Sequence, residues 1–343
     1  MQTKQQRERK WEQVRVESAA RLHMGFIDLH GGLGRRFGSI GVALEHPKLI
    51  LEATLAENLR SEGPDGERAE EFARRFYAHY QPSLPSPAIR AHIRVIEAIP
   101  LHQGLGSGTQ LALAVGTALA RLHGIEADPF ELAQVMERGR RSSIGIGAFQ
   151  QGGFLLDGGR RLAGTQPAPI LVRRDLPSDW LFVIVQPPAT PGLSGTQEDR
   201  AFVNLPLPPE EAVGRLARLV MMQMLPALVE EDIVTFGAAL TEVQRLVGDS
   251  FTPVQGGRFA NPLSAQLISD LLEYGALGAG QSSWGPTVYG LVKGEKAAQA
   301  LAEQIRVSSA LSSSSFSSLE PATVYCVPAS NHGARITETE RKV

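Results

Sequence analysis

The sequence contains a single cysteine, Cys326, and lacks long apolar segments. One cysteine excludes an internal disulfide, and a lone cysteine after a strand-like run is typically a small buried hydrophobe. No apolar run reaches the ~18 residues that a membrane span requires. The polar segment 1–13 lacks the apolar centre of a signal peptide. From these absences we expect a cytoplasmic protein with no membrane partner.

An excess of charge of one sign is also missing. The 34 lysines and arginines are balanced by 36 aspartates and glutamates, which gives a formal net charge of −2. Nucleic acids bind to basic surfaces, so we expect no nucleic-acid partner and a small-molecule ligand instead. The 343 residues, 43% of them hydrophobic, suffice for two packed domains of a globular enzyme.

Strands and helices alternate unevenly along the chain. Apolar residues at helical spacing predict a helix over 66–80, and a second helix begins near Ser107 and ends at Gly124. The other expected helices cover 129–140, 209–225, 230–247, 261–273 and 294–306, and the expected strands cover 14–29, 38–57, 88–99, 152–159, 180–185, 286–293 and 322–327. The polar segments 1–13 and 330–343 are expected to be frayed tails.

The sharpest motif lies between an expected strand and an expected helix. Glycines at positions 104, 106 and 108 let the backbone turn sharply and approach a ligand, while Ser107 and Thr109 supply hydroxyl groups. Free amides and the partial positive charge at a helix start favour an anion. A plain turn with Ser107 as the helix cap explains the same pattern, and both interpretations stay open.

Four further segments carry candidate ligand groups. Arg35 and Arg36 stand in a glycine-rich loop and can clamp a phosphate, or can point into water. Three arginines, ending at Arg141, precede a turn that contains Gly145 and Gly147, and they suit a carboxylate, a phosphate or the end of a helix. Trp284, after Ser282 and Ser283, can stack on an aromatic ring or fill the core. Glu198 and Asp199 can bind a cation or form an ordinary solvated turn.

Taken together, the motifs resemble the GHMP kinase superfamily. The resemblance runs in order through Ala20–Asp28, Gly104–Gln110 and Gly275–Thr287, and covers nearly the whole chain except its ends. It implies a two-domain α+β fold. An N-terminal domain like the second domain of ribosomal protein S5 would cover 14–176, and a ferredoxin-like domain would cover 178–329.

The sequence departs from the kinases of this superfamily. Many kinases carry an aspartate base after the turn at Gly145–Gly147, whereas this chain has Gln150 and Gln151. A neutral amide cannot accept a proton from a substrate hydroxyl as a carboxylate can. The departures resemble one branch of the superfamily, the beta-ribofuranosylaminobenzene 5'-phosphate synthases, in 21–29, 32–35, 145–154, 192–195 and 282–287.

This resemblance implies a decarboxylating pentosyltransferase at the start of methanopterin biosynthesis. Its substrates would be 5-phosphoribosyl 1-diphosphate and 4-aminobenzoate, although 4-hydroxybenzoate stays open as the acceptor. We expect Asp28 and His23 to be catalytic and Arg21 to bind phosphate. Asp28 can equally be structural, and for His23 a structural hydrogen-bonding role is the commoner one. Magnesium held near Glu198 or Asp199, no organic cofactor and a homodimer are expected. The alternatives are an ATP-dependent kinase of this superfamily and a silent protein that binds a phosphorylated metabolite.

Overall fold

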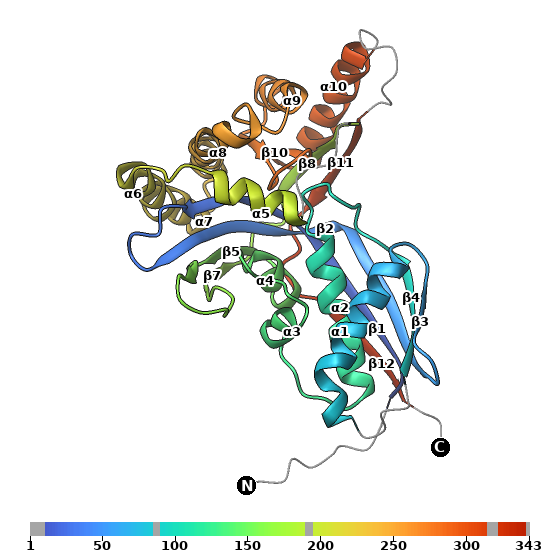
Figure 1. The fold of residues 1–343 in the computed structure, drawn as a ribbon. Helices are drawn as coiled ribbons and strands as arrows, with labels where there is room; N and C mark the ends of the chain where they lie inside the picture. The colour runs from blue at the N-terminus through green and yellow to red at the C-terminus, as the bar shows by residue number, and fades with distance from the viewer. Residues whose placement is uncertain (1–10, 85–89, 189–194, 314–321, 341–343) are drawn as a thin grey trace.

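A computed structural model describes residues 11–84, 90–188, 195–313 and 322–340, which form two β-sheets with helices packed against them (Figure 1). The strands of the larger sheet are β1 (Trp11–Asp28), β2 (Arg35–Ala56), β3 (Arg60–Glu62), β4 (Arg90–Glu97), β5 (Phe154–Asp157), β6 (Arg160–Arg161), β7 (Ile170–Arg174) and β12 (Arg335–Glu340). Those of the smaller sheet are β8 (Trp180–Gln186), β9 (Gly278–Gln281), β10 (Val288–Lys293) and β11 (Thr323–Pro328).

The helices are α1 (Gly66–Tyr80), α2 (Ser107–Leu122), α3 (Pro129–Val135), α4 (Ile144–Gln150), α5 (Gly195–Asn204), α6 (Glu210–Leu219), α7 (Leu225–Val229), α8 (Ile233–Gln255), α9 (Pro262–Glu273) and α10 (Glu295–Ser313). A 3₁₀ turn (Gln81–Ser83) follows α1, and a π-helical segment (Val220–Met224) joins α6 to α7.

The larger sheet has the strand order β12-β1-β2-β4-β3, and β5 and β6 pair with other parts of the long strand β2. The smaller sheet is antiparallel, with the order β11-β8-β10-β9. Helices α1 and α2 lie side by side over the larger sheet, while α8, α9 and α10 lie at the smaller one (Figure 1). The hairpin of β1 and β2 extends away from α1 and α2 and reaches α6 and α7 (Figure 1).

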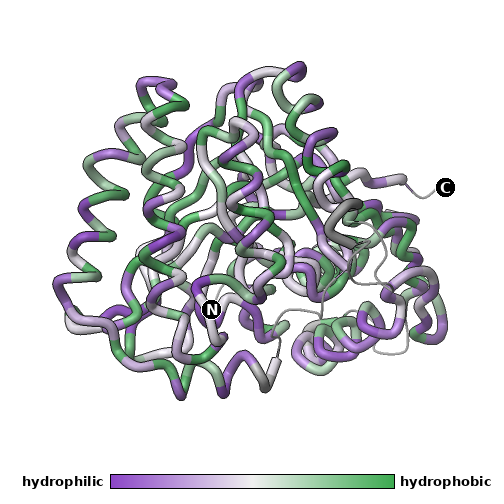
Figure 2. Tube along the Cα trace, turned by 90° about the horizontal axis from the view of Figure 1, so that it is seen from above, coloured by the Kyte–Doolittle hydropathy of each residue, from purple (hydrophilic) through white to green (hydrophobic). Residues whose placement is uncertain are grey.

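The core follows the hydropathy pattern of these elements. Alternate residues of β1, from Val14 and Val16 to Leu22 and Met24, are fully buried, as expected of a strand with one covered face. Helix α2 is rich in alanine and leucine and is buried on nearly all sides, because it packs between the larger sheet and the helices α1, α3 and α4. Apolar stretches accordingly run through the interior of the trace (Figure 2).

The helices over 66–80 and from Ser107 were predicted correctly. Helix α3 ends at Val135, not near 140, because Glu137 and Gly139 adopt the left-handed backbone conformation. Helix α8 continues to Gln255, eight residues beyond the predicted end at 247. The segment that contains Glu198 and Asp199 was predicted to be a loop, and it forms α5.

The C-terminal segment corrects the prediction of a frayed tail. Residues of β12 pair antiparallel with β1, from Glu17 opposite Arg335 to Trp11 opposite Glu340. Ile336 is the one large apolar side chain of this strand, so its sequence shows no clear apolar alternation. Long-range backbone pairing, rather than side-chain burial, therefore defines this strand.

One helical run also differs from the expectation that no segment suits a membrane. Glu210–Val229 is long and apolar enough to cross a membrane by length and composition alone, and 28% of its most apolar window is buried. Two glutamates and two arginines occupy its first half, so the sequence shows no continuous apolar run there. A single run of this kind is weak grounds for a membrane span.

Candidate active site

The glycine-rich turn before α2 is held open at the start of the helix. Gly104 and Gly106 have φ angles of 74° and 85°, and Gly106, not Ser107, is the N-cap residue. The first bonded amides are those of Thr109 and Gln110, which both donate to the carbonyl oxygen of Gly106. Among the described residues, the amides of Ser107 and Gly108 have no acceptor. The helix start therefore presents free N–H groups, as an anion site requires.

Arg21 of β1 lies directly beside this turn. Its Nη1 donates to the carbonyl oxygen of Gly104 at 2.5 Å, and its side chain would contact a Cβ placed on Gly106. Burial lowers the pKa of the guanidinium to about 10, and the negative charge of Glu198 opposes this shift. The side chain is still a cation at neutral pH, so a half-buried positive charge faces the helix start.

Two more guanidinium groups converge on Gly108 from the other side. A Cβ on Gly108 would lie 2.9 Å from Nη2 of Arg68, on α1, and 3.6 Å from Cζ of Arg138, in the turn after α3. The prediction named the segment that contains Arg138 but missed Arg68. In the sequence, Arg68 looks like any arginine on a helix surface. Only the packing of α1 on α2 brings it to the turn.

His23 connects the first and third predicted motifs. Its backbone amide donates to Oγ of Ser282, and its carbonyl oxygen accepts from the amide of Ser283, each at 3.0 Å. Oγ of Ser282 in turn donates to the carbonyl oxygen of Gly104 at 2.7 Å. These bonds bring residues 23, 104 and 282 together, as predicted for one site.

The His23 ring itself is buried and neutral. Neither ring nitrogen has a hydrogen-bond partner among the described residues, and the ring centroid lies 4.6 Å from that of Phe26. Burial first, and then the charge of Arg21, lower the pKa of the imidazole to about 3. At neutral pH, the uncharged ring can offer one hydrogen-bond donor and one acceptor to a ligand, but it lacks the second proton of an imidazolium.

The structure places three further candidates, Asp28, Arg35 and Arg36, at the tip of the β1–β2 hairpin. Oδ1 of Asp28 accepts from the amides of His30 and Gly31, each at 2.8 Å, so this carboxylate caps the hairpin loop. Arg35 donates to the carbonyl oxygen of Gly159, and Arg36 to that of Leu29. Asp28 lies seven positions after Arg21 along the strand, or about 23 Å at roughly 3.3 Å per residue. These three residues do not belong to the wall of the glycine-rich turn.

Gly145 and Gly147 lie in α4 and permit close packing. A Cβ on Gly145 would contact Thr109 at 3.0 Å, and one on Gly147 would contact Leu155 at 3.1 Å. The carbonyl oxygen of Gly145 accepts from Nε2 of Gln110 at 2.8 Å, which ties α4 to α2. Both glycines support the helix that carries the phosphate turn, rather than forming a separate ligand loop.

The carboxylates predicted to bind a metal are engaged by an arginine. Arg141 pairs with Glu198 and Asp199, each at 2.5 Å, and lies over the ring of Phe202. Oε1 of Glu198 also accepts from Nε1 of Trp284 at 3.0 Å. Among the described residues, no group of three or more His, Cys, Asp or Glu side chains is arranged to hold a metal ion. These carboxylates therefore do not fit a magnesium site built by the protein.

An aromatic recess lies next to the turn. Trp284 packs against Phe202 and Phe251, and Phe26 packs against the same two rings. The recess is lined by aromatic, amide and charged side chains: His23, Phe26, Gln244, Phe251, Gln255, Arg258, Phe259, Gln281 and Trp284. Trp284 was predicted either to stack on a ligand ring or to fill the core. Its side chain is buried against the core and also lines the recess.

Comparisons with known proteins agree with this architecture. The family models described as GHMP kinases N terminal domain and GHMP kinases C terminal match residues 68–153 and 224–308. A galactokinase from Lactococcus lactis superposes with a TM-score of 0.66 at 17% identity, covering 94% of this chain and 95% of the kinase. This likeness confirms the predicted two-domain α+β fold of the GHMP kinases.

Curated relatives define the family more narrowly. A beta-ribofuranosylphenol 5'-phosphate synthase from Methanothermobacter thermautotrophicus is 33% identical over 291 residues, 80% of this chain and 87% of that protein. A protein of the same name from Methanocaldococcus jannaschii is 32% identical over 300 residues, 80% of this chain and 88% of that protein. The chain therefore belongs to the beta-ribofuranosylphenol 5'-phosphate synthase family of the GHMP kinase superfamily.

Proposed function

We propose that this protein transfers the 5-phosphoribosyl group of 5-phosphoribosyl 1-diphosphate to a 4-substituted benzoate, as an early step of methanopterin biosynthesis. The names of the archaeal relatives describe the product as a ribofuranosylphenol 5'-phosphate and not as an aminobenzene. We therefore place 4-hydroxybenzoate ahead of 4-aminobenzoate, the acceptor that the sequence motifs suggested. The transfer releases pyrophosphate and carbon dioxide.

The single observation that carries this proposal is the anion site at the start of α2. Free amides of Ser107 and Gly108 and the half-buried cation of Arg21 meet there, and no carboxylate forms an ion pair with Arg21 among the described residues. Positive groups fixed before the reaction stabilise charge that grows on a leaving group. A departing pyrophosphate is a leaving group of this kind.

The chemistry needs no proton acceptor at the ring. The bond from ribose C1 to the diphosphate oxygen breaks, and its electron pair leaves with pyrophosphate. The ring carbon that bears the carboxylate then forms the new bond to C1. The bond to the carboxylate breaks, and its electron pair restores the aromatic ring as carbon dioxide departs. A neutral His23 with a pKa of about 3 suits this sequence of steps, because carbon dioxide leaves in place of a proton.

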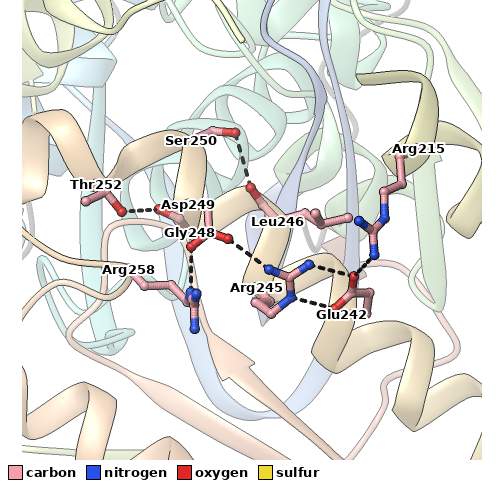
Figure 3. Close-up of polar contacts among 9 residues, drawn as sticks. All are labelled: Arg215, Glu242, Arg245, Leu246, Gly248, Asp249, Ser250, Thr252 and Arg258. Atoms are coloured by element: carbon pink, nitrogen blue, oxygen red, sulfur yellow. Dashed lines mark hydrogen bonds and ion pairs between the residues drawn. The ribbon is translucent and has the colours of Figure 1, made fainter. Parts of the chain in front are cut away.

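The aromatic recess is the acceptor site that we favour. Phe26, Phe251 and Trp284 offer ring faces to an aromatic acid, and His23 offers unused ring nitrogens. Arg258 brings a positive charge to the same recess. Its Nε donates to Asp249 at 2.7 Å, and Arg245 bonds the other oxygen of that carboxylate (Figure 3). The recess encloses about 40 Å³, room for a water molecule, so a benzoate enters only if side chains rotate.

Magnesium stays a prediction. Because Glu198 and Asp199 are paired with Arg141, we assign no protein ligands to the ion and no step to it. The predicted homodimer likewise stays a prediction.

A direct assay separates this function from its rival. The purified protein is mixed with 5-phosphoribosyl 1-diphosphate and with 4-hydroxybenzoate or 4-aminobenzoate carrying a labelled carboxyl group, with and without Mg²⁺. We expect labelled carbon dioxide in proportion to pyrophosphate, and faster release from 4-hydroxybenzoate. Absence of release from both acids, together with transfer of the γ-phosphate of ATP to a small alcohol, would instead support the kinase.

A further inference from the structure

Arg138 is a half-buried cation without a carboxylate partner. It forms no ion pair among the described residues, and its Nε is buried without a hydrogen-bond acceptor. Its neighbours differ in this respect: Arg75 pairs with Glu71 and Glu137, and Arg140 pairs with Glu137. A buried charge without a partner is unfavourable, so its retention needs a reason.

The groups around Arg138 do not neutralise its positive charge. Its guanidinium lies 5.0 Å from the ring centroid of Phe72, which gives only partial compensation. Burial and the positive charges of Arg68 and Arg75 lower the pKa of Arg138 to about 10, while Glu71 opposes the shift. Arg138 therefore remains charged at neutral pH, in a positive field.

Arg138 and Arg68 point to the same place, the start of α2. Both guanidinium groups lie close to Gly108, whose amide has no acceptor among the described residues. Arg68 has one carboxylate partner, Asp65, at 2.8 Å. A side chain at position 108 would occupy the space next to both arginines, so glycine keeps that space open.

Resting on the function proposed above, we propose that Arg138 and Arg68 form the subsite for the terminal phosphate of the diphosphate. Arg21 and the turn at Gly104–Gly106 hold the phosphate attached to C1, on the other side of the helix start. Two guanidinium groups and a free amide match the three oxygens of a terminal phosphate. This subsite takes up the charge that develops on pyrophosphate as it leaves.

Inorganic pyrophosphate is the probe that tests this inference. Its dissociation constant is measured by isothermal titration calorimetry for the full chain and for Arg138→Met and Arg68→Gln. We expect each variant to bind pyrophosphate at least tenfold more weakly. The control Arg74→Gln removes the same charge from the exposed face of α1, where Arg74 pairs with Glu70, and should change the constant less than twofold.

Ligand-free stability distinguishes a binding role from a structural one. If Arg138 is kept for a ligand, Arg138→Met should unfold at the same temperature as the parent protein or higher, because a half-buried cation without an ion-pair partner is removed. If Arg138 serves mainly to pack on Phe72, the melting temperature should fall and pyrophosphate binding by Arg68→Gln should stay unchanged. That combination, or unaltered binding in both variants, would overturn the inference.

The result is separable from the proposed function, since pyrophosphate binding needs no acceptor. Weakened binding in both variants of a protein that releases no carbon dioxide would retain the diphosphate subsite and reject the reaction. Normal binding in both variants of a protein that releases carbon dioxide would retain the reaction and reject the diphosphate subsite.

Discussion

Arg21 donates a hydrogen bond of 2.5 Å to the carbonyl oxygen of Gly104, a residue 83 positions further along the chain. The bond fixes the first strand of the larger sheet to the turn that starts α2. It also directs a half-buried cation at the helix start, where the amides of Ser107 and Gly108 are free. Much of the proposed chemistry depends on this pairing of a strand residue with a glycine turn.

Replacing Arg21 should therefore weaken sugar binding. We expect Arg21→Met to raise KM for 5-phosphoribosyl 1-diphosphate by about 10- to 100-fold, since hydrogen bonds to charged groups contribute roughly 1.5–3 kcal/mol. Steady-state kinetics provide the measurement. Arg15→Met on the same strand removes an arginine paired with Glu17 and Glu52, and should leave KM unchanged. Equal KM values in both variants would contradict the assignment of Arg21.

Asp28 offers a test between catalysis and capping. Its Oδ1 accepts two backbone amides, and the amide oxygen of asparagine can accept the same two bonds. We expect Asp28→Asn to keep both its melting temperature and its kcat, because the carboxylate caps the hairpin loop and lies about 23 Å along the strand from Arg21. Thermal unfolding and turnover are measured on the same sample. A loss of turnover of roughly 100-fold at an unchanged melting temperature would contradict this and place Asp28 in the mechanism.

Burial of His23 predicts a specific dependence of stability on pH. The folded protein holds this imidazole neutral, with a pKa of about 3, whereas the unfolded chain takes up a proton below about 6.5. The unfolded state thus binds more protons between these values, and stability is lost as pH falls through this window. The loss approaches about 1.4 kcal/mol per pH unit.

Denaturant unfolding at several pH values from 7 to about 4 measures this effect. The free energy of unfolding should fall more steeply with acidification in the parent protein than in His23→Gln, which has no ionisable group at this position. Parallel curves for the two proteins would show that the imidazole is accessible to protons in the folded state.

The pairing of β12 with β1 predicts a stability role for the C-terminal strand. Removing residues 335–343 leaves one edge of β1 without its partner. We expect the free energy of unfolding to fall by roughly 3 kcal/mol, because each lost ladder bond contributes roughly 1 kcal/mol net. Removing only residues 341–343 is the control. A truncated protein as stable as the control would show that β12 is dispensable.

Much of the architecture was predictable because the spacing of apolar residues and the positions of the motifs indicate the same helices and strands. Apolar spacing marks α1 and α2, and the turn between Gly104 and Gly108 falls where a strand gives way to a helix. The contact of His23 with Ser282 followed only from the resemblance to a known superfamily, since no local rule brings residues 259 positions apart together.

Other features depend on tertiary contacts that leave little trace in the sequence. Arg68 resembles any solvated helix arginine until α1 packs on α2 and places it near Gly108. Glu198 and Asp199 suggested a cation site, but α5 brings them to Arg141 instead. The polar strand β12 is defined by its partner β1 and not by its own side chains. In each case, a charged or polar residue acquires its role from a distant segment.

The position of the sugar diphosphate tests the central claim most directly. A crystal structure of the protein soaked with 5-phosphoribosyl 1-diphosphate should show both phosphates at the start of α2. We predict contacts to the amides of Ser107 and Gly108 and to the guanidinium of Arg21. A diphosphate bound elsewhere, with this helix start closed by the protein's own side chains, would contradict the account.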